Sequence, residues 1–310
     1  MTDYQNILII KLGALGDWIH MTGWFRTVRE QWPKAHITLM TGSSFLKLAK
    51  TSPFFDDYIV DNRTWRPWDY LHITTSVLAN GGYDLIIDMQ KQTRTKKRYY
   101  SLARFFTKGP FIWASIEQKG LNLRITPVKK RFTWGTETND FLPLHIQRQD
   151  LSFCKANPEI IKSLPKQYVL FVPGCSPTHP YKRWPATFYH ELGLKLAKTQ
   201  IHTVVLGTNA ERFEIEQICQ GNPMALNFCN KTSLLDIPEI SGKALAVVGN
   251  DTGPQHMAEL GTTPAITLFC DITKNSSVKR DNVTNLIAQN IQDISVEKVY
   301  ETLQSLWHSA

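Results

Sequence analysis

Residues 7–17 read ILIIKLGALGD: four aliphatic residues are followed directly by a turn that holds two glycines and ends on an aspartate. Such an aliphatic run is typical of a buried strand, and glycines directly after it are typical of a turn into a helix. The stretch LAVVGNDTGP at residues 245–254 repeats the pattern. Ligands bind at the carboxyl ends of strands in open α/β sheets, so the two turns predict one substrate site in each half of the chain.

The rest of the chain extends this pattern. Short β-branched runs alternate with longer amphipathic stretches, as in βαβ units around a parallel sheet, and a polar segment at about residues 132–165 interrupts the alternation. We therefore predict an α/β protein of two Rossmann-like, doubly wound domains, residues 1–160 and 161–310, that face a central cleft. The terminal helix from Ser295 to Leu306 is expected to pack back on the first domain. Strands are expected at residues 7–10, 37–40, 58–60, 85–87, 168–172, 203–206, 245–248 and 265–268, and helices at about 18–30, 185–198, 211–219, 234–241 and 254–260.

Composition narrows the class of protein. With 310 residues, of which 42% are hydrophobic and 20% charged, the chain is globular. Lys and Arg exceed Asp and Glu by eight, which favours anionic partners without choosing among them. The five cysteines form no CxxC pair, which favours reduced thiols over a disulfide framework or a zinc site. With no signal peptide and no stretch long enough to span a bilayer, we expect a cytoplasmic protein.

The loop VPGCSPTHPYKRWP at residues 172–185 leads from an expected strand into a helix that is expected to begin at Pro185. Lys182 would then lie just outside the helix, where an ammonium beside free backbone N–H groups suits a diphosphate. Ser176 and Thr178 add hydroxyl donors to the loop, which favours this role over that of an ordinary surface lysine. Glu211 opens a helix after another strand and either contacts a ligand or interacts with the helix dipole.

The turn at residues 249–254 repeats the arrangement. Gly253 has no side chain, so the backbone of this turn can approach a ligand closely, and Thr252 supplies a hydroxyl beside exposed N–H groups. Asp251 would repel phosphates, so we expect it to accept hydrogen bonds from sugar hydroxyls or to brace the loop. His256 lies just inside the following helix, and contact with a ligand and packing within the protein are equally favoured for it.

The first turn carries the candidates for proton transfer. Asp17 heads a helix and could serve as a general base for an acceptor hydroxyl, and the alternative is an N-cap aspartate. Gly13 and His20 are assigned to the same acceptor site, with a solvated His20 as the alternative. Arg63 and Arg66 lie beside tryptophans, and their forked donors suit phosphates or carboxylates on an acceptor. Lys91, Arg94 and the run from Lys96 to Arg98 follow, with a solvated charged face as the alternative, and for the run from Lys96 to Arg98 that alternative is at least as favoured.

At these residues the chain resembles the ADP-heptose:lipopolysaccharide heptosyltransferases, which are glycosyltransferases of the GT-B fold that build the inner core of lipopolysaccharide. Four elements carry the resemblance, in the same order and across nearly the whole chain, and the ordered set is more specific than any one of them. They are ILIIKLGALGDWIH (7–20), DLIIDMQ (84–90), VPGCSPTHPYKRWP (172–185) and VGNDTGPQHMAELG (248–261).

The resemblance implies an inverting transfer of a heptose from ADP-L-glycero-D-manno-heptose to an acidic, lipid-linked oligosaccharide, with no metal and no cofactor. It places the catalytic base on Asp17 and the phosphate-binding lysine on Lys182. It places the remaining donor contacts on Glu211, Asp251, Thr252, Gly253 and His256, and acceptor contacts on Arg63 and Arg66. The lipid-linked acceptor and the basic amino half further imply peripheral contact with the cytoplasmic face of the inner membrane.

Two departures from the family pattern bear on these expectations. Lys91 stands where relatives usually have a glycine, and Cys270-Asp271 stands where they tend to have Gly-Pro. The second departure lies near the expected donor pocket and leaves the nucleotide and sugar open. The alternatives are therefore another GT-B enzyme, including a sugar-nucleotide epimerase, and a non-catalytic binder of anionic surfaces. Nucleic acid is not expected as a partner, because no nucleic-acid motif is present.

Overall fold

The computed structural model describes residues 3–64, 66–73, 82–90, 94–101, 111–116, 123–128, 141–142, 146–277 and 279–308. The chain divides into two compact units, Met1–Phe153 and Cys154–Ala310. The unit boundary thus precedes the expected one at residue 160. Residues around Asn157 belong to the second unit because the backbone N–H of Ala156 donates to Glu239 and that of Asn157 donates to Asp236.

The first unit is built on one seven-stranded sheet with the order β3-β2-β1-β4-β5-β6-β7. Strands β1 to β5 pair in parallel, whereas the pairs β5–β6 and β6–β7 at one edge of the sheet are antiparallel. The aliphatic run of residues 7–10 is fully buried, as expected for a central strand covered on both faces. The strands are β1 Asn6–Ile10, β2 His36–Thr41, β3 Asp57–Val60, β4 Leu85–Asp88, β5 Phe111–Ile116, β6 Leu123–Val128 and β7 Phe141–Leu142.

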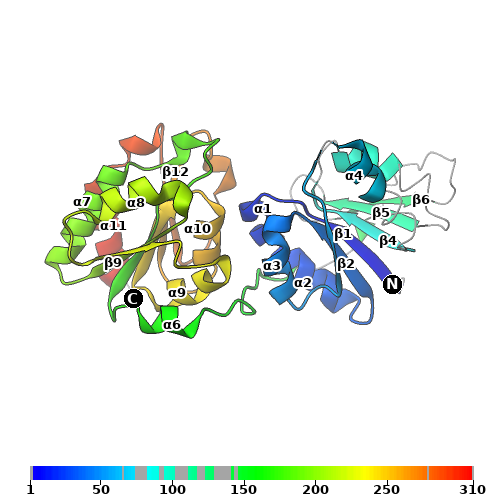
Figure 1. Cartoon of the computed structure of the whole chain (residues 1–310), viewed down its shortest axis with the longest axis horizontal. Helices are drawn as coiled ribbons and strands as arrows, with labels where there is room; N and C mark the ends of the chain where they lie inside the picture. Colours follow the sequence, from blue (N-terminus) through cyan, green and yellow to red (C-terminus); the bar gives the residue numbers. More distant parts are fainter. Residues whose placement is uncertain are drawn as a thin grey trace. The chain divides into compact units, whose positions relative to one another are not determined.

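The four strands that the sequence predicts in this unit are present, each within one residue at either end, whereas β5, β6 and β7 were not predicted. The single helix expected over residues 18–30 is instead two helices, α1 and α2, that meet at Met21. Figure 1 shows α1, α2 and α3 on one side of the sheet and α4 on the other. The described helices are α1 Leu15–His20, α2 Thr22–Gln31, α3 Ser43–Thr51, α4 Pro67–His72 and the π-helical turn η2 Arg94–Tyr99.

The second unit contains a six-stranded, all-parallel sheet with the order β10-β9-β8-β11-β12-β13. Its four predicted strands are present, and β10 and β13 were not predicted. Their half-buried residues explain the omission, because an edge strand of a parallel sheet has a weaker apolar signal. The strands are β8 Tyr168–Val172, β9 His202–Gly207, β10 Ala225–Cys229, β11 Ala246–Asn250, β12 Ala265–Cys270 and β13 Val283–Ala288.

The helices of the second unit cover both faces of its sheet. Figure 1 shows α7, α8 and α11 on one side and α9 and α10 on the other. The terminal helix α11 buries Val299 and Leu303 in the core of this unit beside α7. Its expected contact with the first domain stays a prediction. The helices are α6 Pro158–Lys162, α7 Ala186–Lys198, α8 Arg212–Cys219, α9 Ile237–Lys243, α10 Gly253–Ala258 and α11 Val296–His308.

Each sheet has a point at which the strand order reverses, and such points are where doubly wound folds bind ligands. In the first unit the reversal lies between β1 and β4, and the turn at residues 11–17 follows β1. In the second unit it lies between β8 and β11, which are followed by the loop of Lys182 and by Asp251. The two turns singled out in the sequence therefore lie at the expected positions for binding.

Candidate functional sites

The turn after β1 is held in one conformation by its neighbours. The backbone N–H of Lys11 donates to Met40, and that of Leu12 donates to the side chain of Gln90 at 2.9 Å. Gly13 has a φ of +141°, and a Cβ at this position would lie 2.9 Å from Cε2 of Phe45. Glycine is therefore required at residue 13 both by the backbone conformation and by the close approach of an aromatic ring.

Asp17 projects from the first turn of α1 and keeps 67% of its side chain exposed. The N-cap of α1 is Ala14, so the alternative interpretation of Asp17 as an N-cap is wrong. The Nζ atom of Lys11 lies 3.7 Å from Oδ2 of Asp17. Burial lowers the pKa of Lys11, and the neighbouring carboxylates of Asp17 and Asp88 offset part of this effect. An exposed carboxylate can reach a bound hydroxyl and accept its proton, and the Lys11 ammonium helps to hold Asp17 in place.

The structure brings Arg63 to this turn. A Cβ on Gly13 would lie 3.6 Å from Nη2 of Arg63, so the exposed guanidinium borders the glycine turn. Arg63 has a positive φ of 57°, and its N–H donates to Oδ1 of Asp61 at 2.7 Å. Arg63 thus joins Gly13 and Asp17 in one candidate acceptor site.

Buried residues support the loop that carries Arg63. Asp61 is 1% exposed and accepts hydrogen bonds from Nη2 of Arg94, at 3.1 Å, and from the hydroxyl of Tyr99. Arg94 also donates to the carbonyl of Thr64. A solvated charged face is therefore the wrong interpretation for Arg94. Sequence reasoning missed Asp61 and Tyr99, although the position of Asp61 directly after β3 was an available signal.

Two other residues were predicted for the acceptor site. Arg66 is exposed one residue before α4, and His20 is half-buried in the last turn of α1. Trp68 on α4 is 78% exposed. Trp65 lies outside the described residues. The roles of His20 and Arg66 stay predictions.

In the second unit, Asn250 connects the loop after β8 to the end of β11. Asn250 is fully buried, and its Nδ2 donates to the carbonyl of Pro173 at 2.6 Å. Its Oδ1 accepts hydrogen bonds from the N–H of Trp184 and the hydroxyl of Tyr189. Asn250 therefore holds both ends of the loop that carries Lys182, a role that sequence reasoning missed.

Lys182 ends a 3₁₀ turn, η3 Pro180–Lys182, and its Nζ lies 2.7 Å from Oδ2 of Asp251. The helix that follows begins at Ala186, with Pro185 as its N-cap, so the prediction that Pro185 is the first helical residue is off by one. Lys182 keeps 22% of its side chain exposed, whereas Asp251 keeps 4%. The Lys182 side chain is thus partly exposed, and a nearly buried carboxylate holds its ammonium.

Asp251 is the centre of a hydrogen-bonded network. Besides Lys182, it accepts hydrogen bonds from Oγ of Ser276, at 3.0 Å, and from Nε2 of His256, at 3.1 Å. Burial by itself would raise the pKa of Asp251, but the hydrogen bonds from His256 and Lys182 outweigh burial and lower this pKa to about 2. Of the two roles expected for Asp251, the structure shows that of a brace for the loop.

His256 lies behind Asp251. It is 4% exposed, and its Nδ1 lies 2.8 Å from Oε1 of Glu259 while its Nε2 faces Asp251. Burial by itself would lower the pKa of His256, but the hydrogen bonds to Asp251 and Glu259 raise it to about 9. With both ring nitrogens bonded to protein carboxylates, this geometry does not support the predicted direct contact of His256 with a donor.

The remaining residues predicted for the donor site surround this network. Thr252 is the N-cap of α10, and its hydroxyl makes no hydrogen bond to any described residue. Gly253 begins the helix. Ser176 and Thr178 are exposed and hydrogen-bonded to each other through their hydroxyls at 2.8 Å. A bound ligand could replace this hydrogen bond with bonds to either hydroxyl, because each hydroxyl can both donate and accept.

Glu211 lies between the turn that precedes α8 and the loop after β8. Its Oε2 accepts hydrogen bonds from the N–H and the hydroxyl of Thr208 in a capping box at the 3₁₀ turn η4 Asn209–Glu211. A Cβ on Gly174 would lie 3.4 Å from Oε1 of Glu211. Glu211 thus caps the turn before α8, a contact that sequence reasoning did not predict, and its side chain also borders the loop after β8, where a nucleoside contact stays a prediction.

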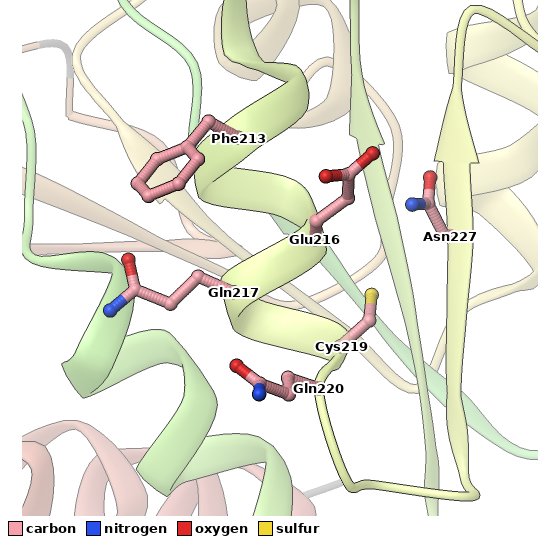
Figure 2. A pocket seen from close by; sticks show the side chains of 6 residues that line it. All are labelled: Phe213, Glu216, Gln217, Cys219, Gln220 and Asn227. Carbon is pink, nitrogen blue, oxygen red and sulfur yellow. The ribbon is translucent and has the colours of Figure 1, made fainter.

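A pocket elsewhere on the second unit contains none of these residues. Figure 2 shows it against α8 and β10, with Phe213, Glu216, Gln217, Cys219, Gln220 and Asn227 around it. Burial raises the pKa of the Cys219 thiol to about 11, so it is protonated and a poor nucleophile at neutral pH. The described residues that line this pocket include no cation for a phosphate, and the ends of β8 and β11 remain the better candidate site.

Within the described residues, no group of three or more His, Cys, Asp or Glu side chains is placed to hold a metal ion. In the same part of the chain, no helix is both long and apolar enough to cross a membrane.

Comparison with known proteins identifies the family. Residues 131–302, more than half of the chain, match the sequence model of glycosyltransferase family 9 (heptosyltransferase). The chain belongs to this family. It is therefore a glycosyltransferase with the GT-B fold, and the resemblance found in the sequence is confirmed. The match takes in Lys182, Asp251 and their network, whereas Asp17 lies outside it.

Individual relatives in glycosyltransferase family 9 are distant in sequence. The chain is 21% identical over 308 residues to the lipopolysaccharide core heptosyltransferase OpsX of Haemophilus influenzae, with 92% of this chain and 84% of the relative covered. A family 9 glycosyltransferase from Veillonella parvula superposes with a TM-score of 0.73 at 17% identity, covering 99% of this chain and 98% of that one. The E. coli heptosyltransferase WaaC, solved with ADP-2-deoxy-2-fluoro heptose, gives a TM-score of 0.70 at 15% identity, covering 97% and 99%. These superpositions show a shared fold.

Proposed function

We propose that this family 9 enzyme transfers a heptose from ADP-L-glycero-D-manno-heptose to the inner core of lipopolysaccharide, with inversion at the anomeric carbon and without a metal. The family description and the name of the Haemophilus relative support the heptosyl transfer and the acceptor. The observation that carries the proposal is the Lys182–Asp251 pair, which presents an accessible ammonium at the strand-order reversal of the second unit.

On the donor side, Lys182 binds the diphosphate. Its ammonium is partly exposed and is tied to Asp251, so a phosphate oxygen can bind the exposed side while Asp251 keeps the side chain in place. The exposed hydroxyls of Ser176 and Thr178 supply further donors. Charge-assisted hydrogen bonds of this kind are stronger than neutral ones and suit a leaving group that gains charge.

On the acceptor side, Asp17 is the general base. The acceptor oxygen attacks the anomeric carbon while its proton passes to the Asp17 carboxylate, and the bond from that carbon to the diphosphate breaks. The electron pair leaves with ADP, and Lys182 stabilises its charge. A single displacement of this kind inverts the anomeric configuration. Arg63, held at the Gly13 turn, binds an acidic group of the acceptor.

The exposed residues of α4 bear on where in the cell the enzyme acts. The acceptor is lipid-linked, and α4 presents Trp68, 78% exposed, and Leu71, 48% exposed, just after the exposed Arg66. An apolar surface next to a cation suits an anionic bilayer, and the net charge of +8 also favours binding to an anionic surface. We therefore propose that the enzyme acts peripherally at the cytoplasmic face of the inner membrane. Flotation of the wild-type enzyme with anionic vesicles should decrease when salt is added, and Trp68→Ser should float less than the wild type at low salt. Flotation that neither salt nor the substitution reduces would contradict this location.

The donor assignment is tested by calorimetric titration with ADP-heptose, ADP-glucose and UDP-sugars. We expect tightest binding of ADP-heptose, and a preference for a UDP-sugar would overturn the assignment. Incubation of ADP-heptose without acceptor separates transfer from epimerisation, because an epimerase would convert the donor alone. Addition of a chelator should leave the rate of transfer unchanged if no metal takes part.

A further inference from the structure

His256 faces a carboxylate oxygen at each of its ring nitrogens. Nε2 lies 3.1 Å from Oδ1 of Asp251, and Nδ1 lies 2.8 Å from Oε1 of Glu259. A carboxylate can only accept hydrogen bonds, so both nitrogens must carry a proton for both bonds to form. The geometry therefore requires an imidazolium, in a position where the side chain is 5% exposed.

Glu259 is itself fixed on its other side. It is 2% exposed, its Oε2 accepts a hydrogen bond from the hydroxyl of Thr267 at 2.8 Å, and its Oε1 accepts one from Nη1 of Arg280 at 2.9 Å. Two charged groups face His256 directly from different elements: Asp251 after β11 and Glu259 at the end of α10. Lys182 and Arg280 lie beyond these two carboxylates. Charges thus alternate along one chain: Lys182, Asp251, His256, Glu259 and Arg280.

We propose that Glu259 is a positioning residue of the donor site: it holds His256 as an imidazolium, His256 holds the carboxylate of Asp251, and Asp251 holds the ammonium of Lys182 where the diphosphate binds. The identity of the ligand in this proposal rests on the proposed function. The arrangement keeps Lys182 in place without exposing a second cation to the donor. It also explains how a carboxylate can lie beside a phosphate site, because the positive charge of His256 balances the negative charge of Asp251.

A purely structural role for Glu259 would make a different prediction. If the carboxylate only stabilised the core, its loss would lower stability and leave the charge of His256 and the affinity for the donor unchanged in the folded protein. If it positions Lys182 through His256, both properties change together. The change is then reversed at lower pH, because solvent protons restore the imidazolium.

The test compares the wild-type protein with Glu259→Gln, which keeps the shape of the side chain and removes its charge. The ¹⁵N resonances of histidine are followed between pH 6 and 9, with the His256 signals assigned by their loss in His256→Asn. In the wild type we expect both nitrogens of His256 to remain protonated at pH 8, and in Glu259→Gln we expect the ring to become neutral at that pH.

Titration with ADP gives the second readout. We expect Glu259→Gln to bind ADP several-fold more weakly than the wild type at pH 8 and about equally well at pH 6. Glu239→Gln is the matched control, because Glu239 also accepts a hydrogen bond within the second unit but lies outside this chain of charges, and it should match the wild type at both pH values. Should Glu259→Gln fail to fold, Arg280→Gln removes the cation that faces the same carboxylate. The negative charge of Glu259 is then less neutralised, so the ring of His256 should stay protonated at pH 8 and ADP should bind at least as tightly as in the wild type, and a neutral ring in this variant would contradict the positioning role.

Two results would overturn the positioning role: a wild-type His256 that is neutral at pH 8, or a Glu259→Gln variant that binds ADP with wild-type affinity at that pH. Failure of the proposed function has a different signature. If the wild type binds neither ADP nor inorganic pyrophosphate, the assignment of the donor site is wrong, while the histidine titration still decides whether Glu259 controls the charge of His256.

Discussion

The ammonium of Lys182 and the carboxylate of Asp251 lie 2.7 Å apart, although 69 residues separate them in the sequence. The pair joins the loop after β8 to the end of β11, the two strands between which the strand order reverses. Asp251 is nearly buried and Lys182 is partly exposed, so the pair has one side supported by protein and one side open to a ligand. This asymmetry is the basis for the predictions about donor binding.

Replacement of Lys182 should weaken donor binding. Lys182→Met removes the ammonium and leaves Asp251 bonded to Ser276 and His256, so the fold is retained. We expect roughly a 10- to 100-fold loss of affinity for ADP-heptose, the usual range for one hydrogen bond between charged groups. Calorimetric titration measures it. Lys198→Met, at the exposed end of α7, should bind like the wild type, and equal affinities for the two variants would remove Lys182 from the donor site.

Replacement of Asp17 should separate chemistry from donor binding. Asp17→Asn keeps the size of the exposed side chain and removes its ability to accept a proton at neutral pH. The loss of a general base typically lowers kcat by about 10²- to 10⁴-fold, and the Kd for ADP-heptose should not change. Steady-state kinetics with purified acceptor, together with donor titration, measure both values. Transfer at the wild-type rate would show that another group accepts the proton.

Gly13→Ala should destabilise the first unit. The new Cβ would lie 2.9 Å from Phe45, and the φ of +141° is unfavourable for alanine. We expect a loss of about 1–3 kcal/mol in the free energy of unfolding, measured by urea denaturation. The matched control is Gly242→Ala in α9, where nothing lies within 4 Å of the new Cβ. There alanine should be neutral or stabilising, because it favours a helix.

Asp61→Asn should loosen the loop that carries Arg63. The substitution removes the buried charge that faces Arg94 and weakens the support of residues 61–64. Breaking a buried ion pair typically costs about 3–5 kcal/mol of stability, and here we also expect a higher KM for the acceptor with the donor Kd unchanged. Asp57→Asn, exposed at the start of β3, serves as the control. A wild-type KM in Asp61→Asn would show that Arg63 is positioned by other contacts.

Stability should fall at alkaline pH through His256. Its pKa is raised to about 9 in the folded protein, whereas about 6.5 is usual in an unfolded chain. The folded state therefore binds this proton more tightly, and the stabilisation is complete below about pH 6.5 and is lost as the pH rises through about 9. The effect is at most ~3 kcal/mol. Urea denaturation of the wild type and His256→Gln should give stabilities that converge above pH 9, and a constant difference would contradict the raised pKa.

Local sequence patterns were sufficient for the central part of both sheets. Fully buried parallel strands such as residues 7–10 and 168–172 carry continuous apolar runs, and the glycine turns directly after them are visible in the sequence. The edge strands β10 and β13 were missed because half-buried residues weaken that signal. The break between α1 and α2 at Met21 was missed because the apolar spacing continues across it.

The sequence alone determined the doubly wound α/β architecture, the family, and the two turns at which function concentrates, because strand burial and turn chemistry are local properties of the chain. Only the tertiary structure decided which side chains bond to one another. It placed His256 between Asp251 and Glu259, and it buried Arg94 against Asp61, which is 33 residues away in the chain. Hydrogen bonds between such distant residues depend on the packing of several strands and loops, and the spacing of residues along a single chain does not contain that information.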